Sequence, residues 1–191
     1  LGQTFAQTSS RNIWLDDLPS TAKYVIDTDG TYCWATRYDE KIVYGGSSNA
    51  GGVNGTNASA VIQHAINGLT SGRTWQETII LKGDLGEVHD VELDSYLILK
   101  GIQAKMSLPL ANNFIMKQPN KDLTDLTIEG INFTSPTERQ VALYLFYYVG
   151  GSVWRNAYNV KIRDCTFNNF GSGIYAITGR LTVIKRNFFK S

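Results

Sequence analysis

Three carboxylates in the second half of the chain are the residues most able to do chemistry. Asp125 and Glu129 lie four residues apart. Asp164 belongs to a later segment, where it follows Lys161 and Arg163. Two carboxylates on neighbouring strands can act as general acid and as base or nucleophile at a glycosidic bond. The same acids can instead form ordinary cross-strand ion pairs with the two basic residues. No catalytic motif surrounds them, so the sequence favours the ion pairs and leaves the three acids as weak catalytic candidates.

The histidines and cysteines do not have the spacing of metal ligands. His64 lies beside an apolar stripe, which indicates a structural role, and His89 stands alone. Cys33 and Cys165 are far apart in the sequence, and they could form a disulfide or remain two buried thiols. We therefore predict no metal and no cofactor.

Aromatic residues are the stronger candidates for a binding surface. From Val141 to Val149, aliphatic side chains alternate with aromatic ones, so a buried aliphatic face would turn the aromatic face outward. An exposed aromatic ridge is typical of a contact surface for another protein or for sugar rings. Alternatively, the loop at 150–159 folds back and covers it. The predicted interface comprises Tyr144, Phe146, Tyr148, Trp154, Tyr158, Phe188 and Phe189.

Three Asn-x-Ser/Thr motifs could carry N-linked glycans. They begin at Asn54, Asn57 and Asn132. They matter only if the chain is secreted by a cell that glycosylates asparagine, and chance also produces such motifs in a chain rich in Asn, Ser and Thr. We keep all three as glycosylation candidates.

A single helix, at about 56–70, is predicted among the elements that must position these residues. Thr56 or Asn57 can cap its N-terminus, and Gly68 or Gly72 can end it. One face of this helix is apolar, and it must be buried against other elements. We expect it to cap the open end of a coil of strands. The apolar face comprises Val61, Ile62, Ala65, Ile66 and Leu69.

The residues before the helix divide into an arm and a small sheet. Residues 1–20 are polar with few apolar anchors, so this arm either packs on its own subunit, which we favour, or reaches a neighbour as a donated strand. Residues 21–46 contain two β-prone runs around Asp29 and Gly30, which predicts a β-hairpin with a type I′ turn. A third short run at 41–44 is expected to join the hairpin.

Three segments after the helix repeat one pattern. Residues 126–133, 160–167 and 181–188 have apolar first, third and last positions. The 21 residues from the second start to the third are about one rung of a parallel β-solenoid, and the longer first step predicts an insertion between Ser135 and Asn159. Stacking would align two interior columns, which are Phe133, Phe167 and Phe188, and Ile128, Ile162 and Val183.

With these elements in place, the chain resembles right-handed parallel β-helix proteins of the pectate-lyase-like group. Gly55-Thr-Asn-Ala-Ser-Ala-Val-Ile-Gln-His-Ala-Ile66 is similar to the Gly-Thr-Asp-x-x-x-x-Ile-Gln-x-Ala-Ile helix that caps those proteins, and Ile-Ile-Leu-Lys-Gly83 and the repeats follow it. The hairpin, Arg73-Thr-Trp75 and Ser95-Tyr96 are closer to surface β-helix proteins predicted in archaea and their viruses. The resemblance covers about 18–191.

The resemblance implies an all-β fold, namely a short right-handed parallel β-helix (solenoid) with an N-terminal β-hairpin and a single capping α-helix. The cap helix and the β-helix together would occupy residues 47–191. The group includes lyases, hydrolases, phage tailspikes and non-catalytic surface proteins. Its lyases use clustered Asp residues for calcium and a nearby Arg or Lys as base, and its glycosidases use carboxylates on adjacent rungs. No motif here matches those catalytic sets, so none is carried over.

Composition excludes two classes of function. The 191 residues include 18 Lys or Arg and 17 Asp or Glu, with a net charge of +1. This balance argues against nucleic acid as a partner, because phosphate binding needs a clustered positive surface. No run of 18 apolar residues is present, so we predict no membrane span.

The C-terminal repeat stops on a rung without a cap, which would expose apolar side chains and strand edges. Either the natural protein continues beyond Ser191 or another subunit covers this end. We therefore expect a homo-oligomer, either a trimer or a head-to-tail assembly. The predicted function is a non-catalytic extracellular or virion-surface structural or adhesion module that self-associates and contacts cell-surface glycans. The alternative is a polysaccharide lyase or glycoside hydrolase domain of tailspike type.

Overall fold

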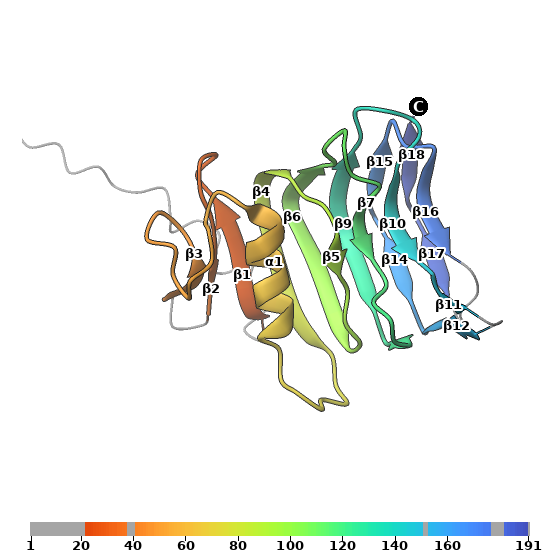
Figure 1. Cartoon of the computed structure of the whole chain (residues 1–191), viewed down its shortest axis with the longest axis horizontal. Helices are drawn as coiled ribbons and strands as arrows, with labels where there is room; N and C mark the ends of the chain where they lie inside the picture. Colours follow the sequence, from red (N-terminus) through yellow and green to blue (C-terminus); the bar gives the residue numbers. More distant parts are fainter. Residues whose placement is uncertain (1–21, 38–40, 151–152, 177–181, 191) are drawn as a thin grey trace, which may run out of the picture.

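The computed structural model describes residues 22–37, 41–150, 153–176 and 182–190, so the predicted arm at 1–20 lies outside the described residues. Within the described residues the structure consists mainly of strands, with one helix packed against them (Figure 1). This confirms the prediction of a predominantly β protein with a single helix.

The largest sheet runs the length of the molecule (Figure 1). Its neighbouring strands from β1 to β17 are parallel, in the order β17-β14-β9-β6-β4-β1, and β2 and β3 extend it antiparallel beyond β1. β15 and β18 continue β14 and β17 after a short break and pair in parallel with their neighbours. The strands are β1 (Ala22–Thr28), β2 (Cys33–Thr36), β3 (Ile42–Gly45), β4 (Glu77–Glu87), β6 (Leu97–Ser107), β9 (Thr127–Thr134), β14 (Lys161–Arg163), β15 (Thr166–Asn168), β17 (Val183–Lys185) and β18 (Phe188–Lys190).

A second parallel sheet has the strand order β16-β10-β7-β5. From β4 onward the chain passes first through the large sheet and then through the second sheet. Each such passage adds the next strand to both sheets. We call each such pass a layer, and the last described layer is β17 with β18. The remaining strands are β5 (Val91–Glu92), β7 (Phe114–Lys117), β8 (Leu123–Thr124), β10 (Val141–Leu145), β11 (Tyr147–Gly150), β12 (Val153–Arg155), β13 (Ala157–Tyr158) and β16 (Ser172–Ala176).

The segment predicted as an insertion between Ser135 and Asn159 is mostly part of the regular structure. It contains β10, which lies between β7 and β16 in the second sheet, and β13, which pairs in parallel with β8. The antiparallel pair of β11 and β12 is the additional element. The insertion is therefore limited to β11 and β12, because the prediction followed the strands of the large sheet alone and counted β10 and β13 as inserted.

The core is built from like side chains that stack between layers. Ile128 and Ile162 are opposite each other in neighbouring strands and both are fully buried. The ring of Phe167 stacks on Phe133, at 5.2 Å between ring centroids, and on Phe189, at 5.0 Å. Such stacks add stabilisation beyond the buried area, which fixes how one layer sits on the next.

The register of the last layer differs from the predicted one by a single residue. Ile162 is opposite Ile184, and Phe167 is opposite Phe189, so the inward positions are Ile184 and Phe189. We expected Val183 and Phe188 there. Because each pair of adjacent apolar residues satisfies the pattern in either register, the sequence alone could not choose, and a shift of one residue turns every side chain to the opposite face.

This register can be tested by truncating each phenylalanine of the last layer in turn. We expect Phe189→Ala to lower the free energy of unfolding by about 1–2 kcal/mol, because a half-exposed ring that stacks on Phe167 is lost. Phe188→Ala should change it by less than about 0.5 kcal/mol, since its side chain points outward. Urea unfolding of both variants measures the difference, and equal losses would contradict the register.

The helix α1 (Ala58–Asn67) forms as predicted. The side chain of Asn57 accepts the backbone N–H of Ala60 at 3.0 Å and caps its N-terminus, and Gly68 follows its last turn. All five residues of the predicted apolar face are buried. The helix packs against β2, β4 and β5.

Polar side chains of α1 close the edge of the second sheet. The backbone N–H of Glu92, in the edge strand β5, donates to Oε1 of Gln63 at 2.7 Å, and its carbonyl accepts from Nε2 of Gln63 at 3.2 Å. Nearby, the N–H of His89 donates to Oγ of Ser59 at 2.9 Å. One amide side chain thus supplies the donor and acceptor that a further strand would supply.

We expect Gln63→Ala to destabilise the fold by about 1 kcal/mol, because both backbone groups of Glu92 lose their partner. Thermal or urea unfolding would measure this. Asn67→Ala is the matched control, since Asn67 contacts the same Gln63 side chain but no strand, and it should have a smaller effect. Equal losses in the two variants would show that the side chain of Gln63 does not close this edge.

The predicted hairpin is confirmed, but its turn type is not. β1 and β2 pair antiparallel with Thr28 opposite Cys33, which leaves a loop of four residues rather than two. Only Gly30 in this loop has a positive φ, whereas a type I′ turn needs two such residues. Instead, Oδ1 of Asp29 accepts the backbone N–H groups of Tyr32 and Thr31, which lowers the pKa of this carboxyl.

Candidate functional site

Two of the three candidate carboxylates lie directly after strands, whereas Glu129 lies within β9. Asp125 follows β8 and Asp164 follows β14, and both have left-handed backbones with φ of 53° and 56°. Short polar side chains such as Asp and Asn tolerate this conformation better than most residues. The backbone therefore accounts for two of the three acids without any catalytic role.

Each carboxylate also has its own partner in a neighbouring layer. Glu129 accepts from Arg163 at 2.6 Å, and Lys100 lies 3.9 Å away. Asp164 accepts two bonds from Arg186 at 2.6 Å, which lower the pKa of this carboxyl. Asp125 accepts from the side-chain amide of Asn159.

These pairings are those of an ion-paired surface. The three acids share no hydrogen-bond partner among those that the structure gives them. A general acid at a glycosidic bond needs a raised pKa, whereas that of Asp164 is lowered. Lys161, the other basic residue considered with them, is exposed on β14.

Stacked aromatic rings cover the outer side of the second sheet. Tyr144, on β10, lies between Phe114 on β7 and Tyr175 on β16, with ring centroids 4.4 Å and 5.3 Å away. Phe146 meets Tyr144 and Tyr175 edge-on. Burial raises the pKa of Tyr144, and Tyr175 adds to the shift. Sequence reasoning found Tyr144 and Phe146 but missed Phe114 and Tyr175, whose strands do not repeat the aromatic alternation.

The stacking limits what this aromatic face can bind. A sugar ring packs on the flat face of an aromatic ring, but both faces of Tyr144 are already in contact with neighbours. Tyr175, 41% exposed, is the end of the stack among the described residues. The rings therefore join the layers to one another, and Tyr175 is the most exposed ring of the stack among the described residues.

The other predicted interface residues are distributed over the C-terminal half. Tyr158, at the end of β13, is 37% exposed. Tyr148 lies opposite Trp154 in the pairing of β11 with β12, but both side chains are outside the described part. Phe188 and Phe189 are 62% and 55% exposed.

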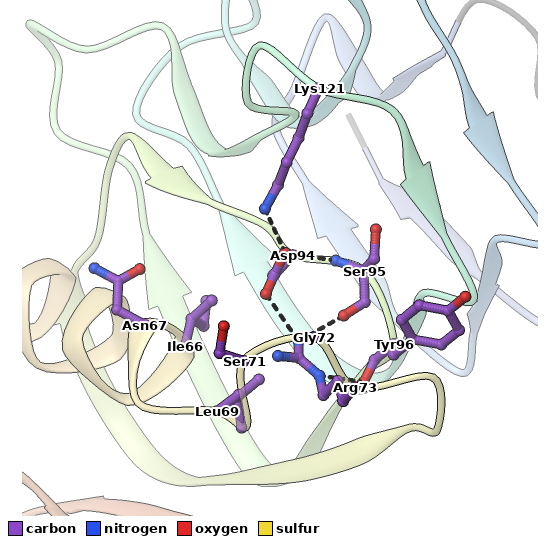
Figure 2. Close-up of a pocket in the computed structure, with 10 residues that line it drawn as sticks. All are labelled: Ile66, Asn67, Leu69, Ser71, Gly72, Arg73, Asp94, Ser95, Tyr96 and Lys121. Carbon is purple, nitrogen blue, oxygen red and sulfur yellow. Dashed lines mark hydrogen bonds and ion pairs between the residues drawn. The ribbon is translucent and has the colours of Figure 1, made fainter.

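A polar pocket lies where α1 ends and the turns before β4 and β6 meet (Figure 2). Its volume is about 510 Å³. Arg73, which is 7% exposed, donates to the carbonyls of Thr70, Ser95 and Tyr96, at 3.2, 2.5 and 3.3 Å. The pocket is lined by Ile66, Asn67, Leu69, Ser71, Gly72, Arg73, Asp94, Ser95, Tyr96 and Lys121.

Asp94 bridges the two cations of this pocket. Its carboxylate lies 2.9 Å from Nη2 of Arg73 and 2.6 Å from Nζ of Lys121 (Figure 2). Burial opposes ionisation of this carboxyl, but the bonds from Lys121, Ser95 and Arg73 outweigh it and lower the pKa. Through these bonds the pocket residues hold three turns together. The sequence feature that could have indicated this pocket is the pair of motifs Arg73-Thr-Trp75 and Ser95-Tyr96, which supply three of its lining residues.

We expect Arg73→Lys to destabilise the protein by about 2 kcal/mol, because one ammonium cannot reach three carbonyls and a carboxylate in different directions. Lys121→Arg is the control, since Lys121 is exposed and contacts the same acid; it should change stability by less than about 0.5 kcal/mol.

The free energy of unfolding of Arg73→Lys, measured as a function of pH, gives a second test of the same variant. The lowered pKa of Asp94 stabilises the fold above the unfolded value of about 4, and this contribution is lost as the pH falls below it. Arg73→Lys should reduce that loss only slightly, because the single bond from Nη2 of Arg73 lowers this pKa less than Lys121 and Ser95 do. An unchanged pH dependence together with unchanged stability would contradict the role given to Arg73.

The histidines and cysteines occupy structural positions. His64 lies beside Tyr44, 5.6 Å between ring centroids, and His89 contacts Asp90 and Asn112. Cys33 and Cys165 are free thiols, separated by four strands of the large sheet. Burial raises their pKa to about 12 and about 11, so both thiols are protonated at neutral pH. Among the described residues, no three His, Cys, Asp or Glu side chains group as metal ligands would.

The three glycosylation candidates differ in their surroundings. Asn54 is exposed, and its side chain accepts from the N–H and hydroxyl of Thr56. Asn57 caps α1, and Asn132 accepts from the side chain of Asn168 at 2.9 Å. Asn54 and Asn57 are both exposed, whereas Asn132 is half-buried.

The chain was also compared with known proteins. No family model, no curated protein and no solved structure matches it. No helix in the described part of the chain is long and apolar enough to cross a membrane.

Proposed function

We propose that the chain is a short right-handed parallel β-helix of the pectate-lyase-like kind, and that it serves as a non-catalytic structural or adhesion module on a cell or virion surface. The alternation between two parallel sheets supports the coil. Parallel strands joined by crossovers are right-handed in about 98% of cases, which supports its hand. The resemblance of the cap helix and hairpin to surface proteins supports an extracellular location.

The observation that carries the function is an apolar patch on the outer face of the last layers. Val183 is opposite Lys161, and Phe188 is opposite Thr166, so both point outward. They are 46% and 62% exposed. A further layer would cover inward Ile184 and Phe189 but would leave these two side chains in solvent. Exposed apolar side chains grouped in this way favour a contact surface, and self-association uses it most simply.

An enzymatic function has less support. The three candidate acids are held in separate pairs, and the cations of the polar pocket are bridged by Asp94. A glycan contact retains support at Tyr175, which is 41% exposed at the end of the described aromatic stack. We therefore place self-association first and glycan binding second.

The native mass of the chain, measured by light scattering over a range of concentrations, tests this function. We expect a concentration-dependent oligomer, and Val183→Ser with Phe188→Ser should weaken its association at least about tenfold, because the apolar patch is removed. Leu110→Ser is the matched control, since Leu110 is 74% exposed on a distant turn. A monomer at every concentration would contradict self-association.

A further inference from the structure

The last layers carry most of the positive charge that is not balanced locally. From residue 160 onward the chain has six Lys or Arg and one Asp, whereas residues 1–159 have twelve and sixteen. Arg163 and Arg186 are paired with Glu129 and Asp164. Lys161, Lys185 and Lys190 are exposed, and none of them has a carboxylate partner within the described residues. The outer face is therefore basic.

Positive and apolar side chains alternate along the outward side of β17 and β18, the two strands of the last layer. Since Val183 and Phe188 point outward, Lys185 and Lys190, two residues further along each strand, point outward with them. We call these four residues the outer patch. A partner that covers it must bring apolar side chains together with negative charge. The outer patch of a second copy is unsuitable, because its lysines would face the lysines of the first.

The chain itself contains a segment with the required chemistry. Residues 13–18 read Ile-Trp-Leu-Asp-Asp-Leu, four apolar residues and two carboxylates. They belong to residues 1–21, the longest stretch outside the described part of the chain. We propose that residues 13–18 of one copy bind the outer patch of a second copy. The apolar residues cover Val183 and Phe188, and the carboxylates approach the lysines.

Chain length requires the second copy. β1 and β17 are separated by β4, β6, β9 and β14, which places them about 24 Å apart at about 4.8 Å per strand. Residue 18 is four residues from Ala22, the start of β1, and four residues span at most about 14 Å. Because its last residue stays within about 14 Å of β1, the segment as a whole cannot lie along the outer patch of its own copy. Each copy thus gives one segment and receives another, which produces a head-to-tail assembly.

This inference rests on the proposed self-association, and two full-length variants separate it from that proposal. The segment variant is Asp16→Lys with Asp17→Lys, and the patch variant is Phe188→Lys. We expect each alone to associate at least about tenfold more weakly than the wild type. An equal mixture should form a one-to-one complex of twice the chain mass, because each variant supplies the part that the other lacks. Glu87→Lys with Glu138→Lys is the charge-matched control, and its association should be unchanged.

A charge exchange within one chain completes the test. Lys185→Glu and Lys190→Glu, added to the segment variant, should restore association. If the patch variant dissociates but the segment variant does not, self-association stands and this inference is wrong. If the wild type is a monomer, both are wrong. If soluble polygalacturonate binds the wild type and Lys185→Glu with Lys190→Glu abolishes that binding without changing the mass, the occupant is an acidic polysaccharide and the inference is overturned.

Discussion

The in-register stacking of like side chains between parallel strands is the constraint on which the rest of the structure depends. Phe133, Phe167 and Phe189 form one column inside the large sheet, and Tyr144 lies between Phe114 and Tyr175 outside the second. Each strand contacts only its neighbours, so one column fixes the register of all residues in the layer. Gly173 is part of this arrangement, because a Cβ there would lie 2.7 Å from the ring of Phe189.

Polar side chains mainly bind backbone groups and charges that the strands leave without a partner. Gln63 completes the edge strand β5, and Arg73 binds three carbonyls in two turns. Glu129 and Asp164 are paired with arginines of the next layer. Backbone groups that lack a partner are costly when water is excluded, which explains why so many polar side chains are used in this way. Because these acids and bases are engaged in structural contacts, few of those described are left for catalysis. This is consistent with the proposed structural function.

The surface that remains is asymmetric along the molecule. The helix α1 covers the edge of the second sheet at one end (Figure 1). The last layer presents Val183, Phe188 and lysines that have no ion-pair partner within the described residues. A molecule whose last layers carry basic and apolar side chains on their outer side favours contacts with an unlike surface, because like charges repel. This asymmetry agrees with the proposed self-association, in which the apolar and acidic residues 13–18 of one copy bind the apolar and basic outer patch of a second copy.

Local patterns in the sequence determined the helix, its Asn57 cap, the first hairpin and the repeated strands, because periodicity and capping act between residues close in the chain. Tertiary structure decided the rest. It selected Ile184 and Phe189 over Val183 and Phe188, since both registers fit the pattern and only contact with Ile162 and Phe167 distinguishes them. It also brought Phe114 and Tyr175 to Tyr144, and Asp94 to Arg73, from strands and turns far apart in sequence. Such pairings depend on which strands become neighbours, and a single sequence does not encode that in any local pattern.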